Sequence, residues 1–250
     1  HIYLISYLKN ILTTKEGSAM LLDIGLITFS AVAVTLCADK FGVSDFLSGV
    51  SKSKKAEDIY SLKIGYSGAI VKRKILISMK VTPHFLVCGL SGSGKSKMVE
   101  LAVRDKNNVV ILNAFDDDFE SVQAERINGN ENILDYLKKL LEEPYKRSEP
   151  LYVVIDEMIV LCTDKKLQKA IIDLLAIGRH YNIFVIGIAQ RALKEDLKFK
   201  DLFNARCCFR QIEESSYRAI LGYSPEDKQL NHREFYVYSD EICKGRTYDL

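Results

Sequence analysis

The sequence lacks the cysteine pairs that stabilise small secreted domains or bind zinc. Its six cysteines contain no C-x-x-C pair; they are Cys37, Cys88, Cys162, Cys207, Cys208 and Cys243. Most of them lie in apolar runs, which favours small buried hydrophobic side chains in a reducing compartment. We therefore expect neither disulfide bonds nor a zinc site.

The chain also lacks a strong excess of charge of either sign. Its 250 residues include 35 Lys and Arg against 33 Asp and Glu, which gives a formal net charge of +2. This balance does not indicate nucleic-acid binding, so a DNA-binding surface would have to arise from local clustering or from assembly. With 48% hydrophobic and 27% charged residues, the composition excludes disorder and suits one substantial core.

Charge is absent altogether from residues 24–38. The run extends back to residue 19 if Asp23 is tolerated, and it then approaches the roughly 20 residues that a bilayer span requires. Threonine, serine and glycine dilute it, so a helix buried beneath another domain is the alternative. The lysines within 52–55 would lie on the cytoplasmic side of a span, and otherwise they belong to a solvated linker.

The most specific motif is a glycine-rich loop between an apolar strand and a helix. Phe85–Cys88 suits a buried strand, and the loop GLSGSGKS after it fits the pattern G-x-x-x-x-G-K-[ST]. Backbone N–H groups and a helix N-terminus can surround phosphates, with Lys95 reaching the outer ones and Ser96 binding Mg²⁺. The predicted nucleotide-binding residues are Gly89, Leu90, Ser91, Gly92, Ser93, Gly94, Lys95, Ser96 and Lys97.

Two acidic segments follow apolar strand candidates. Leu151–Ile155 ends in Asp156 and Glu157, the form of a Walker B element. Its first acid reaches Mg²⁺ and its second polarises the attacking water. We therefore predict Ser96 and Asp156 at the metal and Glu157 as the base. The other segment, Asp116–Asp118, has three carboxylates that could bind a metal, but a solvated loop is the favoured interpretation, because Mg²⁺ in this architecture is held elsewhere.

Strand and helix candidates alternate along the rest of the chain. Strands are expected at 62–66, 69–71, 75–79, 85–88, 109–113, 151–155, 183–189, 206–211 and 234–238, helices at 98–103, 133–141, 165–181 and 213–221, and a charged turn at 72–74. This alternation predicts a mainly parallel sheet with helices on both faces. Ligands collect at the carboxyl ends of such strands, where Gly89, Asp156 and Gln190 lie.

Together these motifs resemble the motor domain of the FtsK/SpoIIIE family in the FtsK–HerA superfamily, over about residues 62–238. PHFLVCGLSGSGKS and YVVIDEM are similar to the Walker A and Walker B segments of that family. LLAIGRHYNIFVIGIAQR and NARCCFRQIEESSYRAILG resemble two of its later segments. The chain departs from the family at 113–115, where Asp-Pro-Lys is frequent, and at Tyr217, which replaces an acid.

The resemblance implies a RecA-like P-loop ATPase of the ASCE class with ATP and Mg²⁺ as cofactors. It implies catalytic roles for Lys95, for Glu157 as the base and for Gln190 as a sensor of the terminal phosphate. Arg179 matches an arginine that reaches the neighbouring subunit's nucleotide in related rings. Arg206 and Arg210 are competing candidates for this arginine finger, and a cation at a helix C-terminus is the alternative role for Arg179.

The resemblance also implies an ATP-driven DNA translocase that works as a homohexameric ring on DNA of any sequence, in conjugative, plasmid or phage DNA transport. A type VII protein-secretion ATPase and a nucleotide-gated assembly module without turnover are the alternatives. The expected organisation is a helical N-terminal segment at 1–50, a linker and β-rich lead-in at 51–84, and the motor domain at 85–250. The motor is expected in the cytoplasm, tethered to a membrane or a secretion or conjugation channel if residues 19–38 span the bilayer.

Overall fold

The computed structural model describes residues 59–68, 71–114, 118–142, 145–190, 198–227 and 229–249. All of them belong to one compact unit, Glu57–Leu250. The predicted N-terminal helical segment, including the candidate membrane span at 19–38, lies outside the described residues. Within the described ranges, no helix combines the length and the apolar character that crossing a bilayer requires.

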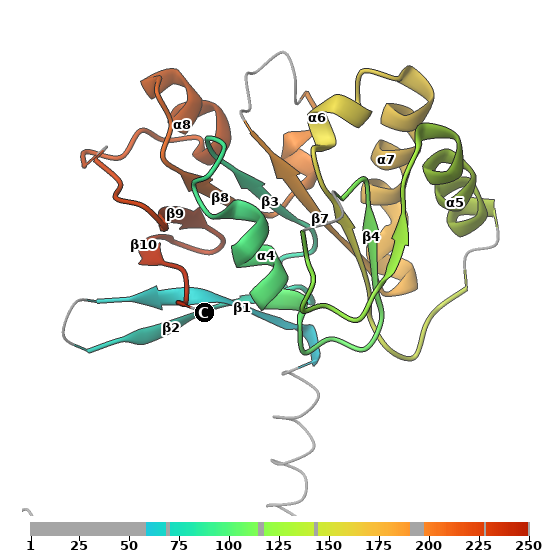
Figure 1. The fold of residues 1–250 in the computed structure, drawn as a ribbon, viewed down its shortest axis with the longest axis horizontal. Helices are drawn as coiled ribbons and strands as arrows, with labels where there is room; N and C mark the ends of the chain where they lie inside the picture. Colours follow the sequence, from blue (N-terminus) through green and yellow to red (C-terminus); the bar gives the residue numbers. More distant parts are fainter. Residues whose placement is uncertain are drawn as a thin grey trace, which may run out of the picture. The chain divides into compact units, whose positions relative to one another are not determined.

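A ten-stranded sheet organises the described unit (Figure 1). Its strand order is β2-β1-β10-β9-β8-β3-β7-β6-β4-β5. The pairs from β8 through β3 to β5 are parallel, and the pairs from β2 to β8 are antiparallel. The sheet is therefore parallel where the predicted motif strands lie, and it is extended on one side by two antiparallel hairpins.

The strands are β1 (Ser61–Ser67), β2 (Arg73–Ser78), β3 (Phe85–Cys88), β4 (Val109–Leu112), β5 (Glu125–Ile127), β6 (Leu151–Ile155), β7 (Ile183–Ala189), β8 (Ala205–Phe209), β9 (Glu234–Tyr238) and β10 (Ile242–Arg246). The α-helices are α4 (Lys95–Val103), α5 (Asn130–Glu142), α6 (Met158–Leu161), α7 (Lys165–Ile177) and α8 (Glu214–Leu221). Two short 3₁₀ helices are η1 (Gly178–Tyr181) and η2 (Lys200–Leu202).

Helices cover both faces of the sheet, as predicted. Helices α5, α7 and α8 pack on one face, and α4 packs on the other together with β1 and β2 (Figure 1). The side chains of β3 show how the two cores are separated, because successive residues of a strand point to opposite faces. Leu86 and Cys88 belong to the core beneath α5 and α7, whereas Phe85 and Val87 belong to the core beneath α4.

Several local predictions need correction. The expected charged turn at 72–74 is wrong, since β2 begins at Arg73 and Lys74 pairs with Tyr66 of β1. This strand lies at the edge of the sheet, where charged side chains reach solvent and are tolerated. The sequence reading missed β5, β10 and the one-turn helix α6. It placed the cysteines correctly as buried residues for Cys88, Cys162, Cys207 and Cys208.

Candidate nucleotide site

A cavity of about 440 Å³ lies at the carboxyl edge of the parallel strands. Its lining comes from the loop after β3, from the ends of β6 and β7, and from the segment before β9. Of the residues predicted for the site, the cavity brings together Ser91, Gly92, Gly94, Lys95, Ser96, Lys97, Asp156, Glu157 and Gln190. Parallel pairing of β3, β7 and β6 produces this convergence, because it places their carboxyl ends side by side.

The phosphate loop has its conformation fixed by backbone bonds and by glycine. The Leu90 N–H donates to the carbonyl of Arg210 at 3.3 Å, and the Ser93 N–H donates to the carbonyl of Leu90 at 3.2 Å. A Cβ at Gly89 would lie 2.5 Å from Cβ of Phe209, so no side chain fits there. Gly94, with φ of 103°, precedes the first residue of α4, a conformation that glycine adopts without strain. The helix N-terminus is thereby directed at the cavity.

Lys95 lies beneath the loop as a nearly buried cation. Its side chain is 7% exposed, and Nζ donates to the carbonyl of Leu90 at 2.9 Å. Burial lowers the pKa of Lys95, and the negative charges of Glu157 and Asp156 oppose that shift. The ammonium group is therefore fixed between the loop and the acidic pair, where an anionic ligand would meet it.

Asp156 and Glu157 follow β6 on the opposite wall of the cavity. Burial raises the pKa of Asp156 to about 6, and the neighbouring charges of Asp118 and Glu157 add to the rise. The Glu157 N–H donates to Oδ1 of Asp156 at 2.9 Å, which stabilises the carboxylate form. Glu157 has a left-handed φ of 46°, and its Oε1 accepts a 2.6 Å bond from Nε2 of Gln190. The predicted base and the predicted sensor are thus in direct contact.

The donor set of the cavity fits a magnesium ion that arrives with a nucleotide. The Ser96 hydroxyl and the Asp156 carboxylate line the same cavity, and Mg²⁺ prefers oxygen donors of this kind. Within the described part of the chain, no group of three or more His, Cys, Asp or Glu side chains forms a metal site by itself. Mg²⁺ usually retains water ligands and binds substrate phosphates alongside one or two carboxylates, so such a group is not required.

The three candidate arginine fingers do not line this cavity. Arg179 lies exposed in η1, before β7 begins, and so at the opposite edge of the sheet. Arg206 lies in β8, 3.4 Å from Asp201, with its guanidinium over the Tyr238 ring. Arg210 follows β8 and contributes its carbonyl to the phosphate loop. A finger role for Arg179 would therefore be exerted on a neighbouring subunit, and it stays a prediction.

Three residues of the cavity were missed or misread by the sequence analysis. Asp118, interpreted as part of a solvated loop, lines the cavity and raises the pKa of Asp156. The reason is that β4 is parallel to β6, so its carboxyl end meets the same edge of the sheet. His232 and Arg233 were not considered, because they fit no local motif and reach the loop only through the pairing of β9 with β8.

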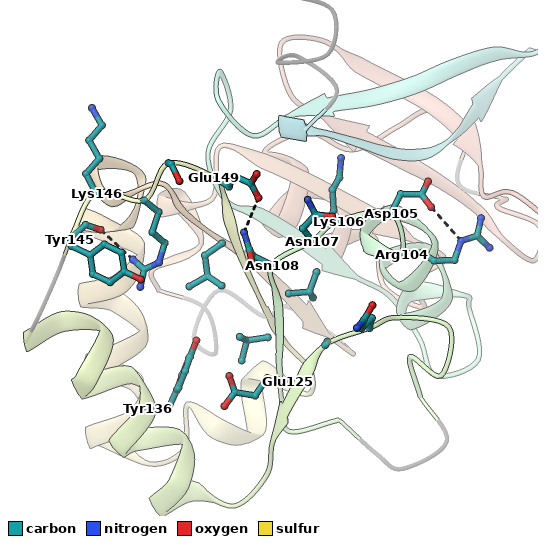
Figure 2. A pocket seen from close by; sticks show the side chains of 17 residues that line it. Arg104, Asp105, Lys106, Asn107, Asn108, Glu125, Tyr136, Tyr145, Lys146 and Glu149 are labelled. Carbon is teal, nitrogen blue, oxygen red and sulfur yellow. Dashed lines mark hydrogen bonds and ion pairs between the residues drawn. The ribbon is translucent and has the colours of Figure 1, made fainter. Parts of the chain in front are cut away.

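A larger hollow of about 1190 Å³ lies at the amino edge of β4 and β6 (Figure 2). Its polar side chains are in part paired with one another: Nε of Arg104 lies 3.9 Å from Asp105, and Nδ2 of Asn108 donates to Glu149 at 3.3 Å. Arg147 rests on the ring of Tyr145, 4.4 Å from its centroid. The hollow holds neither a glycine-rich loop nor the Walker B acids, so we place the candidate site at the carboxyl edge.

No protein-family model and no curated protein matches this chain. Solved structures do match its fold. The pCW3 conjugation coupling protein TcpA, as a monomer with ATPγS, is 14% identical with a TM-score of 0.61, over 76% of this chain and 66% of that one. The cytoplasmic domain of the type VII secretion ATPase EccC from Thermomonospora curvata is 18% identical with a TM-score of 0.62, over 76% of this chain and 29% of that one.

A third structure, EssC (ATPases 2 and 3) from Geobacillus thermodenitrificans, is 14% identical with a TM-score of 0.60, over 76% of this chain and 44% of that one. The chain thus spans less than two thirds of the length of each of these proteins. At such identities the likeness is one of fold. The predicted resemblance is confirmed at that level, and the described unit has the α/β fold of these structures.

Proposed function

We propose that this chain binds ATP with Mg²⁺ and hydrolyses it, and that it uses the energy to move DNA. One observation carries the ATPase part of the proposal. The phosphate loop, Lys95, the pair Asp156 and Glu157, and Gln190 come from separate parts of the sequence and line a single cavity. Each of them has the side chain that its role in phosphoryl transfer requires.

The proposed roles follow from the contacts. Lys95, fixed under the loop, offsets the charge of the outer phosphates. Glu157 is the general base that orients and deprotonates the attacking water. Gln190 donates one N–H of its amide to the Glu157 carboxylate, and the second N–H of the same group is the donor for the terminal phosphate. Gln190 would thereby make the position of the base depend on the phosphate.

The cargo is the finer part of the proposal. The motif series resembles DNA-pumping motors, and one matching structure is a conjugation coupling protein. We therefore propose a ring, with Arg179 reaching the site of the next subunit, that grips DNA through its phosphates without reading sequence. The match to a type VII secretion ATPase is equally good in fold, so a polypeptide cargo is the second candidate.

The ATPase roles are tested with two substitutions and a control. Glu157→Gln should retain ATP binding and lose at least about 100-fold in hydrolysis, the usual contribution of a general base. Lys95→Ala should weaken ATP binding itself. Glu149→Gln, which alters an exposed acid at the opposite edge of the sheet, should leave both unchanged. Full turnover by Glu157→Gln would refute the assignment of the base.

The cargo is tested by measuring ATP hydrolysis with and without duplex DNA over a range of salt concentrations. Because phosphate contacts release counterions, DNA should stimulate the rate, and the stimulation should fall steeply as salt rises. A rate that ignores DNA at every salt concentration contradicts a DNA motor. Stimulation by the C-terminal tail of a secreted partner protein would favour the polypeptide cargo instead.

A further inference from the structure

The segment before β9 lies directly on the phosphate loop of the same chain. Nε2 of His232 is 3.2 Å from the carbonyl oxygen of Gly92. Cγ of Arg233 would lie 3.5 Å from a Cβ placed on Gly94. Both residues line the nucleotide cavity, although they follow the loop by some 140 positions in the sequence. The segment therefore forms one wall of the site within a single subunit.

Arg233 is held there in a conformation that its side chain does not favour. Its φ is 67°, a left-handed region that non-glycine residues enter only with strain. The surrounding structure maintains it: the Thr247 N–H donates to the Arg233 carbonyl at 3.0 Å. Tyr248 packs on Tyr66 of β1, with ring centroids 5.9 Å apart. Strain kept by its surroundings is typical of functional positions.

The guanidinium of Arg233 is bound to a carboxylate from residues 247–249, the segment after β10 that we call the C-terminal strip. Nη1 of Arg233 lies 3.0 Å from Oδ1 of Asp249. The arginine side chain is 27% exposed, whereas the aspartate side chain is 65% exposed. A carboxylate and a phosphate present similar oxygen pairs to arginine. The partner of Arg233 is therefore a solvated anion that a stronger anion can displace.

The charges of the cavity leave Arg233 as the natural second cation for a phosphate. Asp118, Asp156 and Glu157 contribute three carboxylates to the lining. Among the cations, Lys97 is bound to the buried Glu100 at 2.7 Å. A triphosphate bound with Mg²⁺ still carries a net negative charge, and beside three carboxylates it needs more positive charge than Lys95 alone supplies.

We propose that Arg233 is a phosphate-binding residue acting within its own subunit, and that Asp249 competes with the nucleotide for its guanidinium. This inference rests on the proposed ATP binding. It adds Arg233 to the site as a phosphate-binding residue and Asp249 as a residue that regulates the affinity for the nucleotide. Nucleotide binding exchanges one ion pair for another, so the C-terminal strip is released from Arg233 when ATP binds. The device is separate from the arginine finger expected from a neighbour, because it operates in an isolated chain.

The test is the affinity for ATP with Mg²⁺, measured by titration calorimetry on the full chain and its variants. Arg233→Ala should weaken binding about ten-fold, since a charged hydrogen bond to phosphate is lost. Asp249→Asn should tighten binding about two- to five-fold, the strength of an exposed ion pair. The double variant should bind like Arg233→Ala, because Asp249 acts only through Arg233.

Two control variants make each outcome decisive. Asp227→Asn breaks the 2.6 Å ion pair between the segment before β9 and Lys244 of β10, and it should leave the affinity unchanged. Arg233→Lys keeps the charge and should bind ATP better than Arg233→Ala, provided that thermal melting shows both variants folded. If Asp249→Asn weakens ATP binding as much as Arg233→Ala does, the ion pair stabilises the structure of the site and does not compete with the nucleotide. The inference is then overturned.

The failure of the proposed function is distinguishable from the failure of this inference. If the wild-type chain binds no ATP, or if Lys95→Ala binds as tightly as the wild type, the nucleotide site itself is wrong. If the wild type binds ATP and Lys95→Ala does not, but Arg233→Ala retains full affinity, only the role of Arg233 is overturned.

Discussion

Replacing Asp156 with asparagine should stabilise the nucleotide-free protein, and the gain should grow with pH. Burial raises the pKa of this carboxyl from 3.8 to about 6, whereas the unfolded chain keeps the ordinary value. Between these pH values the folded state holds a proton that the unfolded state has released, so the free energy of unfolding falls as pH rises. A shift of about two pKa units corresponds to about 3 kcal/mol at neutral pH.

His84 makes the opposite contribution from the other edge of the sheet. Burial lowers its pKa from 6.5 to about 4, and the charge of Arg179 adds to the shift. Its Nδ1 accepts the N–H of Val185 at 2.9 Å. Between pH 4 and 6.5 the unfolded state holds the proton, so the free energy of unfolding rises with pH. In the wild-type protein the contributions of Asp156 and His84 to the pH dependence of the free energy of unfolding are similar in size and opposite in sign. In Asp156→Asn only the His84 contribution remains, so the free energy of unfolding should rise from pH 4 to pH 6.5.

Urea unfolding followed by circular dichroism measures the effect. The free energy of unfolding of Asp156→Asn minus that of the wild type should grow by about 2 kcal/mol from pH 4 to pH 6.5 and then level off. Asp173→Asn, which removes an exposed carboxylate paired with Lys169, should show no such growth. A difference that stays constant with pH, or that declines, would refute the argument that Asp156 is ionised at a cost in the folded protein.

Two further predictions concern assembly and a helix cap. If Arg179 acts on a neighbouring subunit, mixing Arg179→Ala with Lys95→Ala should restore part of the ATPase activity that each variant lacks. Some interfaces in the mixture then combine an intact Lys95 with an intact Arg179. No restoration at any mixing ratio would contradict an arginine finger that acts between subunits. Asp164 caps α7 by accepting hydrogen bonds from the N–H groups of Lys166 at 2.7 Å and Leu167 at 3.3 Å. Asp164→Ala should therefore lower the free energy of unfolding, measured by urea titration, by about 1 kcal/mol. An unchanged unfolding midpoint would show that the cap does not stabilise the protein.

The central strands could be predicted because each is a continuous apolar run, which indicates a buried strand. Phe85–Cys88 and Leu151–Ile155 are continuous apolar runs, and every residue of both is buried. Strands covered on both faces need no alternation of polar and apolar residues. The phosphate loop and the Walker B pair follow these runs directly, so their meeting at one edge of the sheet was also foreseeable once the parallel pairing was assumed.

The remaining parts of the site depend on pairings that are distant in sequence. Strand β10 reads ICKGR, and only one of its five residues is buried, so nothing local distinguishes it from a loop. Arg233 reaches the cavity because Phe235 of β9 pairs with Phe209 of β8. Asp118 reaches it because β4 pairs with β6. Pairing partners are not encoded by local periodicity, and these residues were therefore missed or misread.

The strand order β2-β1-β10-β9 gives the last described strand a connecting role in the sheet. Strand β10 lies between β1 and β9, and the carboxyl-terminal end is drawn beside β1 (Figure 1). Removing β10 would leave one edge of β1 and one edge of β9 without a partner strand. The hairpin of β1 and β2 would then lose its hydrogen-bonded link to the rest of the sheet.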